Sequence, residues 1–220
     1  MYLRISRAGR LFLVALGGWL ALADANAAIK DVPFLQDVSI KFRSAGALSN
    51  TTLRRLEFDR NGVAYVLTDR GVARTFDSVL TLDRSFRPLT GLVARDIALG
   101  RGELFYLFDD RWLSNGDSGK PLGHLPNGMF TSLAVADDGT VLLAGPNKLS
   151  LFRAGQLTEL TPPPANLPLR LFSYGNDFFV LTGTEILRIR DGNLSQFHRG
   201  EGVTTIAFRD EEMLIGTHNG

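Results

Sequence analysis

The sequence predicts an all-β fold assembled from one repeated unit. Strands rich in aromatic and β-branched residues end at positions 68, 108, 145, 182 and 217, so the unit recurs every 35 to 40 residues. Every unit has the same internal order, and its earlier strands are the most apolar, as expected of strands covered on both faces. Four short antiparallel strands per unit are typical of a β-propeller blade. We therefore predict a propeller of four-stranded blades, incomplete at about four blades and a half.

The second strand of each unit aligns best with its counterparts. These strands are Val63–Thr68, Glu103–Phe108, Thr140–Gly145, Asp177–Thr182 and Met213–Thr217. The first strands precede them at Leu53–Phe58, Val93–Leu99, Phe130–Val135, Leu169–Tyr174 and Val203–Phe208. Turn residues such as Asp59-Arg60-Asn61-Gly62 and Asp137-Asp138-Gly139 separate the two and suit a hairpin that needs φ > 0.

A third strand follows in four of the units. We expect it at Gly71–Phe76, Arg111–Ser114, Lys148–Arg153 and Glu185–Arg190, and a weaker fourth strand at, for example, Gln156–Leu160 and Asn193–Phe197. The repeat region then spans 53–220, with units starting near 53, 93, 129, 167 and 203. A sandwich or barrel of eight strands also needs short strands and frequent turns, but the equal unit length favours the propeller.

The fifth unit has only two of its strands, which leaves an edge that needs a partner. The N-terminal segment 28–52 contains a candidate ring-closing strand, Asp37–Phe42. Either this strand closes a ring of about five blades, or the chain is the N-terminal part of a longer ring. We expect the second possibility, because the closing strand would bring the last blade to only three strands.

Residues 1–27 have the form of a secretory signal peptide. Its basic, apolar and small-residue regions are Arg4, Arg7 and Arg10, the run Leu11–Leu22, and Ala25-Asn26-Ala27. The apolar run is shorter than the roughly 20 residues of a membrane span, so an uncleaved anchor is the alternative. We expect a periplasmic or secreted bacterial protein with no direct membrane insertion after cleavage.

Composition narrows the function. The formal net charge is +1, and removal of three arginines and Asp24 lowers it to −1, which does not favour nucleic acid as a partner. The chain has no cysteine, which excludes thiol catalysis and thiolate metal sites. The three histidines His124, His198 and His218 lack the spacing of a metal site. We expect no metal and no cofactor.

Two units carry a more specific pattern. The first has Asp59, Gly62, Tyr65, Val66, Thr68 and Gly71, and the last has Ile215-Gly216-Thr217-His218-Asn219-Gly220. These residues resemble the two-component-regulator propeller repeat, D-x-x-G-x-L-W-I-G-T-x-x-G, with Tyr65 and Leu214 at the Trp position. The middle units match only in hydrophobic pattern. The resemblance implies the exported sensing part of a membrane histidine kinase, with loops on one face reading the ligand.

No catalytic constellation is apparent, so we expect a ligand-binding or sensing module. Asp69, Asp109 and Asp110 directly follow second strands, and Trp112 is among the aromatic residues most free to contact a ligand. The expected partner is a small molecule or glycan, or an envelope protein. An exported lyase or glycan hydrolase that uses these acidic residues around a central channel is one alternative. A scaffold for envelope assembly is another.

Overall fold

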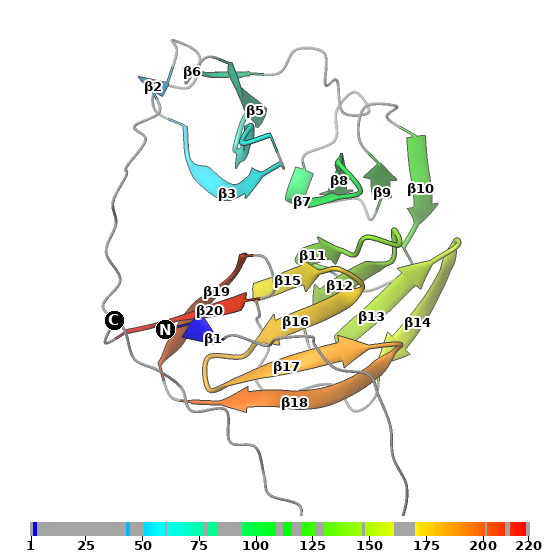
Figure 1. The fold of residues 1–220 in the computed structure, drawn as a ribbon. Coiled ribbons are helices and arrows are strands. Elements are labelled where there is room, and N and C mark those ends of the chain that lie inside the picture. Colours follow the sequence, from blue (N-terminus) through cyan, green and yellow to red (C-terminus); the bar gives the residue numbers. More distant parts are fainter. Residues whose placement is uncertain are drawn as a thin grey trace, which may run out of the picture.

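A computed structural model of the chain (Figure 1) describes residues 2–3, 43–44, 51–59, 61–76, 79–82, 94–108, 112–115, 120–125, 130–146, 148–160, 170–200, 202–209 and 212–218. All regular elements in these ranges are β-strands. No membrane-crossing helix occurs within them. The proposed closing strand Asp37–Phe42 lies outside the described residues.

Three sheets consist of four strands that follow one another along the chain, each antiparallel to the next. Blade 2 contains β7 (Ala94–Gly100), β8 (Glu103–Phe108), β9 (Trp112–Asn115) and β10 (Lys120–His124). Blade 3 contains β11 (Ser132–Val135), β12 (Val141–Gly145), β13 (Lys148–Arg153) and β14 (Gln156–Leu160). Blade 4 contains β15 (Arg170–Tyr174), β16 (Asp177–Leu181), β17 (Glu185–Arg190) and β18 (Asn193–Arg199).

The first and last sheets have additional short strands. Blade 1 contains β3 (Leu53–Phe58), β4 (Ala64–Thr68), β5 (Gly71–Phe76) and β6 (Val79–Leu82), and β2 (Arg43–Ser44) lies parallel to β6. The partial blade 5 contains β19 (Val203–Arg209) and β20 (Glu212–Thr217), and β1 (Tyr2–Leu3) pairs antiparallel with β20. β1 lies within the expected signal peptide.

Turn chemistry explains where the hairpins reverse. The Asp59 carboxylate accepts hydrogen bonds of 2.9 Å from the backbone N–H groups of Asn61 and Val63. Gly62 follows with a φ of 78°, a conformation that is strained for residues with a side chain. The turn of blade 3 repeats the device, because Asp138 accepts from the Thr140 backbone N–H. The predicted hairpin turns are confirmed at both positions.

The core lies between the blades, because each complete blade is only one sheet thick. On β12, Val141 and Leu143 pack in a cluster shared with blade 2, whereas Leu142 and Ala144 pack in a cluster shared with blade 4. A strand covered on both faces in this way reads as a continuous apolar run. This explains why the second strands were the clearest signal in the sequence.

The first strands of the blades face the middle of the molecule (Figure 1). β3 packs against β7, β7 against β11, β11 against β15 and β15 against β19. Separate four-stranded sheets arranged around a common centre are a β-propeller, not a sandwich of two sheets. The predicted fold is confirmed as four blades followed by a partial fifth.

Candidate functional site

A cavity of about 790 Å³ lies at the centre of the blades. Residues from the first strands of all five blades, β3, β7, β11, β15 and β19, line its wall. Each complete blade has four antiparallel strands, so the chain returns to the end of the blade where it started. All five first strands therefore begin at the same end of the cavity. We call this the start end, and the opposite one, where the first strands turn into the second, the hairpin end.

A cluster of three charged residues joins two blades beside the central cavity. Arg55 of β3 lies between Glu57 on its own strand and Asp96 of β7. Its Nε donates to a Glu57 carboxylate oxygen at 2.7 Å, and its Nη1 donates to Asp96 Oδ2 at 3.2 Å. Arg55 and Glu57 are two positions apart and share one face of β3, and that face is turned toward blade 2.

Asp96 is the most buried member of this cluster, with 5% of its surface exposed. Its Oδ2 also accepts a hydrogen bond of 2.9 Å from the backbone N–H of Leu133 on β11. One carboxylate of blade 2 is thus in contact with blade 1 through a side chain and with blade 3 through the backbone. A buried carboxylate needs such partners, since an unpaired one would be costly.

Burial changes the acidity of the cluster. It raises the pKa of Asp96 to about 6, although Arg55 and the backbone N–H groups of Leu133 and Ile97 oppose the shift. Burial also raises the pKa of Glu57, against the attraction of Arg55. At Arg55, burial alone would lower the pKa, but Asp96 and Glu57 outweigh it and the pKa is raised. Asp96 is therefore the member that changes charge near pH 6.

Three further arginines line the cavity at the start end. Arg54 and Arg95 are the second residues of β3 and β7, and Arg170 is the first residue of β15. Arg170 Nη1 donates to the backbone carbonyl of Thr204 on β19 at 3.0 Å, which places its guanidinium beside the neighbouring blade. Arginines from three blades therefore contribute to the lining at one end of the cavity.

Apolar side chains gather at the hairpin end of the cavity, where Glu57 and Ser173 also contribute to the lining. Leu56 and Phe58 of β3, Leu99 of β7 and Phe208 of β19 line it. Phe208 also stacks on Tyr174, with ring centroids 4.8 Å apart. Leu56 and Phe58 are each 52% exposed, so their side chains present apolar surface that other described residues leave uncovered.

A second cavity, of about 740 Å³, lies between blades 3 and 4. Its charged lining includes Asp138, which accepts hydrogen bonds from the Thr140 backbone and hydroxyl and contacts Arg153 at 3.4 Å. Burial alone would raise the pKa of Asp138, but these partners and Arg101 lower it. Its interactions are those of a hairpin turn, and only two blades contribute to the cavity.

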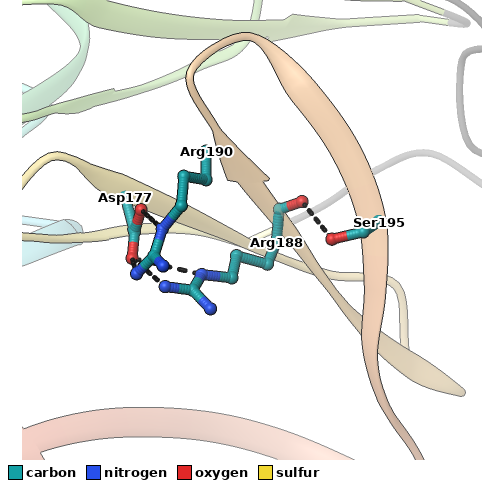
Figure 2. Close-up of polar contacts among 4 residues, drawn as sticks. All are labelled: Asp177, Arg188, Arg190 and Ser195. Carbon is teal, nitrogen blue, oxygen red and sulfur yellow. Dashed lines mark hydrogen bonds and ion pairs between the residues drawn. The ribbon is translucent and has the colours of Figure 1, made fainter. Parts of the chain in front are cut away.

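Blade 4 holds another ion cluster, shown in Figure 2. Asp177 at the start of β16 receives the guanidinium groups of both Arg188 and Arg190 on β17, through bonds of 2.5 to 3.1 Å. The Ser195 hydroxyl donates to the Arg188 carbonyl at 3.4 Å. Alternate residues of β17 share a face, so both arginines reach the same carboxylate. All four residues belong to one blade, in which the cluster links β16, β17 and β18.

The sequence-predicted ligand residues fall elsewhere. Asp69 is exposed on the turn between β4 and β5, where its carboxylate accepts from the Thr52 backbone N–H at 3.2 Å, and it does not line the central cavity. Asp109 and Asp110 lie outside the described residues. Trp112 begins β9, but its side chain is outside the described part. The ligand role of all four stays a prediction.

Sequence reasoning missed Arg54, Arg55, Arg95, Asp96 and Arg170. A signal was present, since charged residues stand at or near the beginning of first strands that are otherwise largely apolar in three of the five units. Within the described residues, no group of three or more His, Asp or Glu side chains is placed to hold a metal ion.

Comparison with known proteins supports the fold. No protein-family model and no curated protein matches the chain. Among solved structures, the extracellular domain of a putative one-component system from B. thetaiotaomicron is 18% identical, with a TM-score of 0.54 over 78% of this chain and 26% of that one. The surface component PorZ of the type-IX secretion system of Porphyromonas gingivalis is 19% identical, with a TM-score of 0.54 over 74% of this chain and 23% of that one.

A solved enzyme structure is about as similar to this chain by TM-score. A catalytically inactive virginiamycin B lyase from Staphylococcus aureus, solved with quinupristin, is 15% identical, with a TM-score of 0.55 over 75% of this chain and 62% of that one. This chain thus spans about a quarter of the first two proteins and three fifths of the lyase. At identities this low, the structural similarity establishes a shared propeller fold and nothing further. The resemblance of the repeats to the two-component-regulator type fits that fold.

Proposed function

We propose that this protein is an exported binding or sensing module that takes a small ligand in its central cavity. The observation that carries the proposal is the convergence of five first strands on one cavity of about 790 Å³. Ligand sites in proteins are concave, largely preformed and furnished with a few convergent polar groups. This cavity has that form, because charged groups at the start end lie opposite apolar side chains at the hairpin end.

Three further observations support export and binding. Residues 1–27 have signal-peptide form, and two of the similar structures are described as an extracellular domain and a bacterial surface component. The charged cluster of Arg55, Glu57 and Asp96 forms part of the cavity wall and fixes the positions of β3, β7 and β11. A wall held in this way presents a preorganised surface to a ligand.

The rival function is an exported enzyme, and one feature of the cavity favours it. Asp96 has a pKa raised to about 6 by burial, and such carboxyl groups act as general acids or bases in many enzymes. The lyase similarity points the same way. Against it, Asp96 Oδ2 already accepts hydrogen bonds from Arg55 and Leu133. Turnover of a substrate that Asp96→Asn abolishes would establish the enzyme in place of the binding module.

The absence of cysteine allows a direct test. Ser173→Cys places one thiol in the lining of the central cavity, and Ser195→Cys places one on the outer strand of blade 4. Each variant is labelled with an environment-sensitive fluorophore and titrated with sugars, amino acids, nucleotides and carboxylates. We expect at least one compound to change the emission at Ser173→Cys saturably and to leave Ser195→Cys unchanged.

Two results contradict the proposal. In one, no compound changes the emission at Ser173→Cys, and the protein instead recovers a single envelope protein from membranes, as a scaffold would. In the other, every compound changes both labelled variants alike, which indicates that the dyes report a nonspecific effect.

A further inference from the structure

The cavity between blades 3 and 4 is separate from the central one. Its volume of about 740 Å³ lies within the range of about 300–1,000 Å³ that is typical of ligand pockets. No described residue lines both cavities. A ligand between blades 3 and 4 would therefore occupy a site of its own.

Hydrogen bonds between two turns hold the walls of this cavity together. The backbone N–H of Asp137, in the turn between β11 and β12, donates to the carbonyl of Gly175, in the turn between β15 and β16, at 2.8 Å. The next N–H, that of Asp138, donates to Asn176 Oδ1 at 3.0 Å. Both bonds join one blade to the other, so the cavity is largely preformed, which lowers the cost of binding.

The lining changes from apolar to polar toward the surface. Its most buried side chains are those of Leu160, Phe178 and Ile189, each at most 5% exposed. Leu151 packs against the same core cluster. We call these four residues the floor. The rim consists of the exposed polar residues Gln156, Thr158, Glu159 and Asn176.

The rim has hydrogen-bonding capacity that the fold leaves unused. Gln156, Thr158 and Glu159 belong to β14, and their side chains form no hydrogen bond or ion pair with the part of the chain that the structure describes. The Asn176 side chain uses its oxygen to accept from Asp138. Its Nδ2 group is left to donate to a ligand.

Donors and acceptors occur together in this rim. Asn176 Nδ2 can only donate, and the Glu159 carboxylate can only accept. The Gln156 amide and the Thr158 hydroxyl do both. A hydroxyl group also donates and accepts, so a ligand that carries several hydroxyls matches the whole set.

Charge disfavours an anion at this site. Among the described residues, Arg153 is the only basic residue of the lining, and it already contacts Asp138 at 3.4 Å. Asp191 has an electrostatic neighbour in Arg190, which lies outside the lining. An anionic ligand would therefore meet the Glu159 carboxylate, and like charges repel.

We propose that the cavity between blades 3 and 4 is a second binding site, which takes a short neutral oligosaccharide. The C–H faces of its sugar rings contact the floor, and its hydroxyls bond to the rim. Glu159 accepts from sugar hydroxyls, and Asn176 Nδ2 donates to one. The site is independent of the proposed function, which concerns the central cavity.

Neutral trisaccharides of different linkage and composition test the ligand class in ligand-observed NMR titrations of the full chain. The probes are maltotriose, cellotriose, mannotriose and xylotriose. Trigalacturonate is the anionic control, and glycerol is a neutral polyol without a ring. We expect at least one trisaccharide to bind at least about tenfold more tightly than both controls, because only it combines floor contact with several hydrogen bonds and no repulsion.

Variants locate the binding. Glu159→Gln should weaken the neutral sugar about fivefold to tenfold, since bonds to a charged acceptor are stronger than bonds to an amide, and should strengthen trigalacturonate. Gln156→Ala should weaken the neutral sugar about threefold to tenfold. Glu185→Gln and Gln196→Ala make the same two changes on β17 and β18, outside both cavities, and should alter nothing.

Failure of this site is distinguishable from failure of the central one. Sugar binding that Glu159→Gln and Gln156→Ala both leave unchanged, or that the two control variants weaken as much, overturns the assignment to this cavity. A change of emission at Ser173→Cys would then place the sugar in the central cavity. Binding of trigalacturonate or glycerol as tight as that of the trisaccharides, or no binding of any trisaccharide, overturns the ligand class.

Discussion

The Asp96 carboxylate accepts a hydrogen bond from the backbone N–H of Leu133, with 2.9 Å between Oδ2 and the nitrogen. These residues belong to adjacent blades and are 37 positions apart in sequence. The same oxygen binds Arg55 of the preceding blade. One buried carboxylate therefore connects three blades beside the cavity, and its charge state affects how firmly they are held together.

Stability should fall as the pH rises through the titration of Asp96. Its pKa is raised to about 6 in the folded chain and is about 3.9 when unfolded. Between these values the folded state binds more protons than the unfolded state, so the contribution is fully present below about pH 4 and is lost by about pH 7. The loss amounts to roughly 3 kcal/mol at most. Urea unfolding across this pH range measures it.

Asp96→Asn serves as the matched control, because it cannot titrate while every other group still does. The free energy of unfolding of the variant, relative to the natural protein, should rise between pH 4 and pH 7.5. Parallel curves for the two proteins would show that burial does not raise the pKa of Asp96.

Asp96→Ala should destabilise the fold even where the carboxyl is protonated. At pH 5 the backbone N–H of Leu133 loses its acceptor, and an unsatisfied buried donor costs about 1–3 kcal/mol. Asp96→Asn retains a carbonyl oxygen that accepts the same hydrogen bond and should cost less. Equal unfolding midpoints for the two variants in urea would mean that the bond to Leu133 contributes nothing.

Gly100→Ala should destabilise the contact between blades 2 and 3. A Cβ added at Gly100, the last residue of β7, would lie 2.6 Å from the Val135 Cβ, a separation that forces one strand to move. Overpacking of this kind costs about 1–3 kcal/mol. The penalty should shrink in a Val135→Gly background. A penalty that is equal in both backgrounds would place the strain elsewhere.

Export should remove the first 27 residues. We expect the protein recovered from a bacterial periplasm or medium to begin at Ala28, as N-terminal sequencing would show. The mature chain would then lack β1, the antiparallel partner of β20. Ala27→Arg should block processing. An exported protein that still begins at Met1 would favour the anchor alternative.

The sequence predicted strands best where the signal was local. The bounds of β3, β5, β13, β14 and β17 match the expected ranges, because apolar periodicity and flanking turns define them. The fourth strand of blade 2, β10, was harder to predict, since its residues Lys120–His124 include a proline and a glycine, which are rare within strands.

The site was harder to predict from the sequence than the fold was. Arg55 and Asp96 are 41 positions apart, and nothing in either unit indicates that they meet. The acidic residues predicted to bind a ligand, such as Asp69, follow second strands, whereas the central cavity is lined by first strands. That lining depends on how the blades are arranged around their centre, which pairwise alignment of the units does not reveal.

Hydrogen–deuterium exchange, with and without a saturating amount of a compound that changes the emission at Ser173→Cys, tests the central claim that the first strands enclose the binding site. Among the strands that the structure describes, each first strand pairs with its second strand on one edge and has no partner on the other, so N–H groups on that other edge face the cavity and respond to an occupant. We expect slower exchange in peptides that cover β3, β7 and β15, and unchanged exchange in β14 and β18. Protection confined to the outer strands, or no protection at saturation, would contradict a binding site at the centre of the blades.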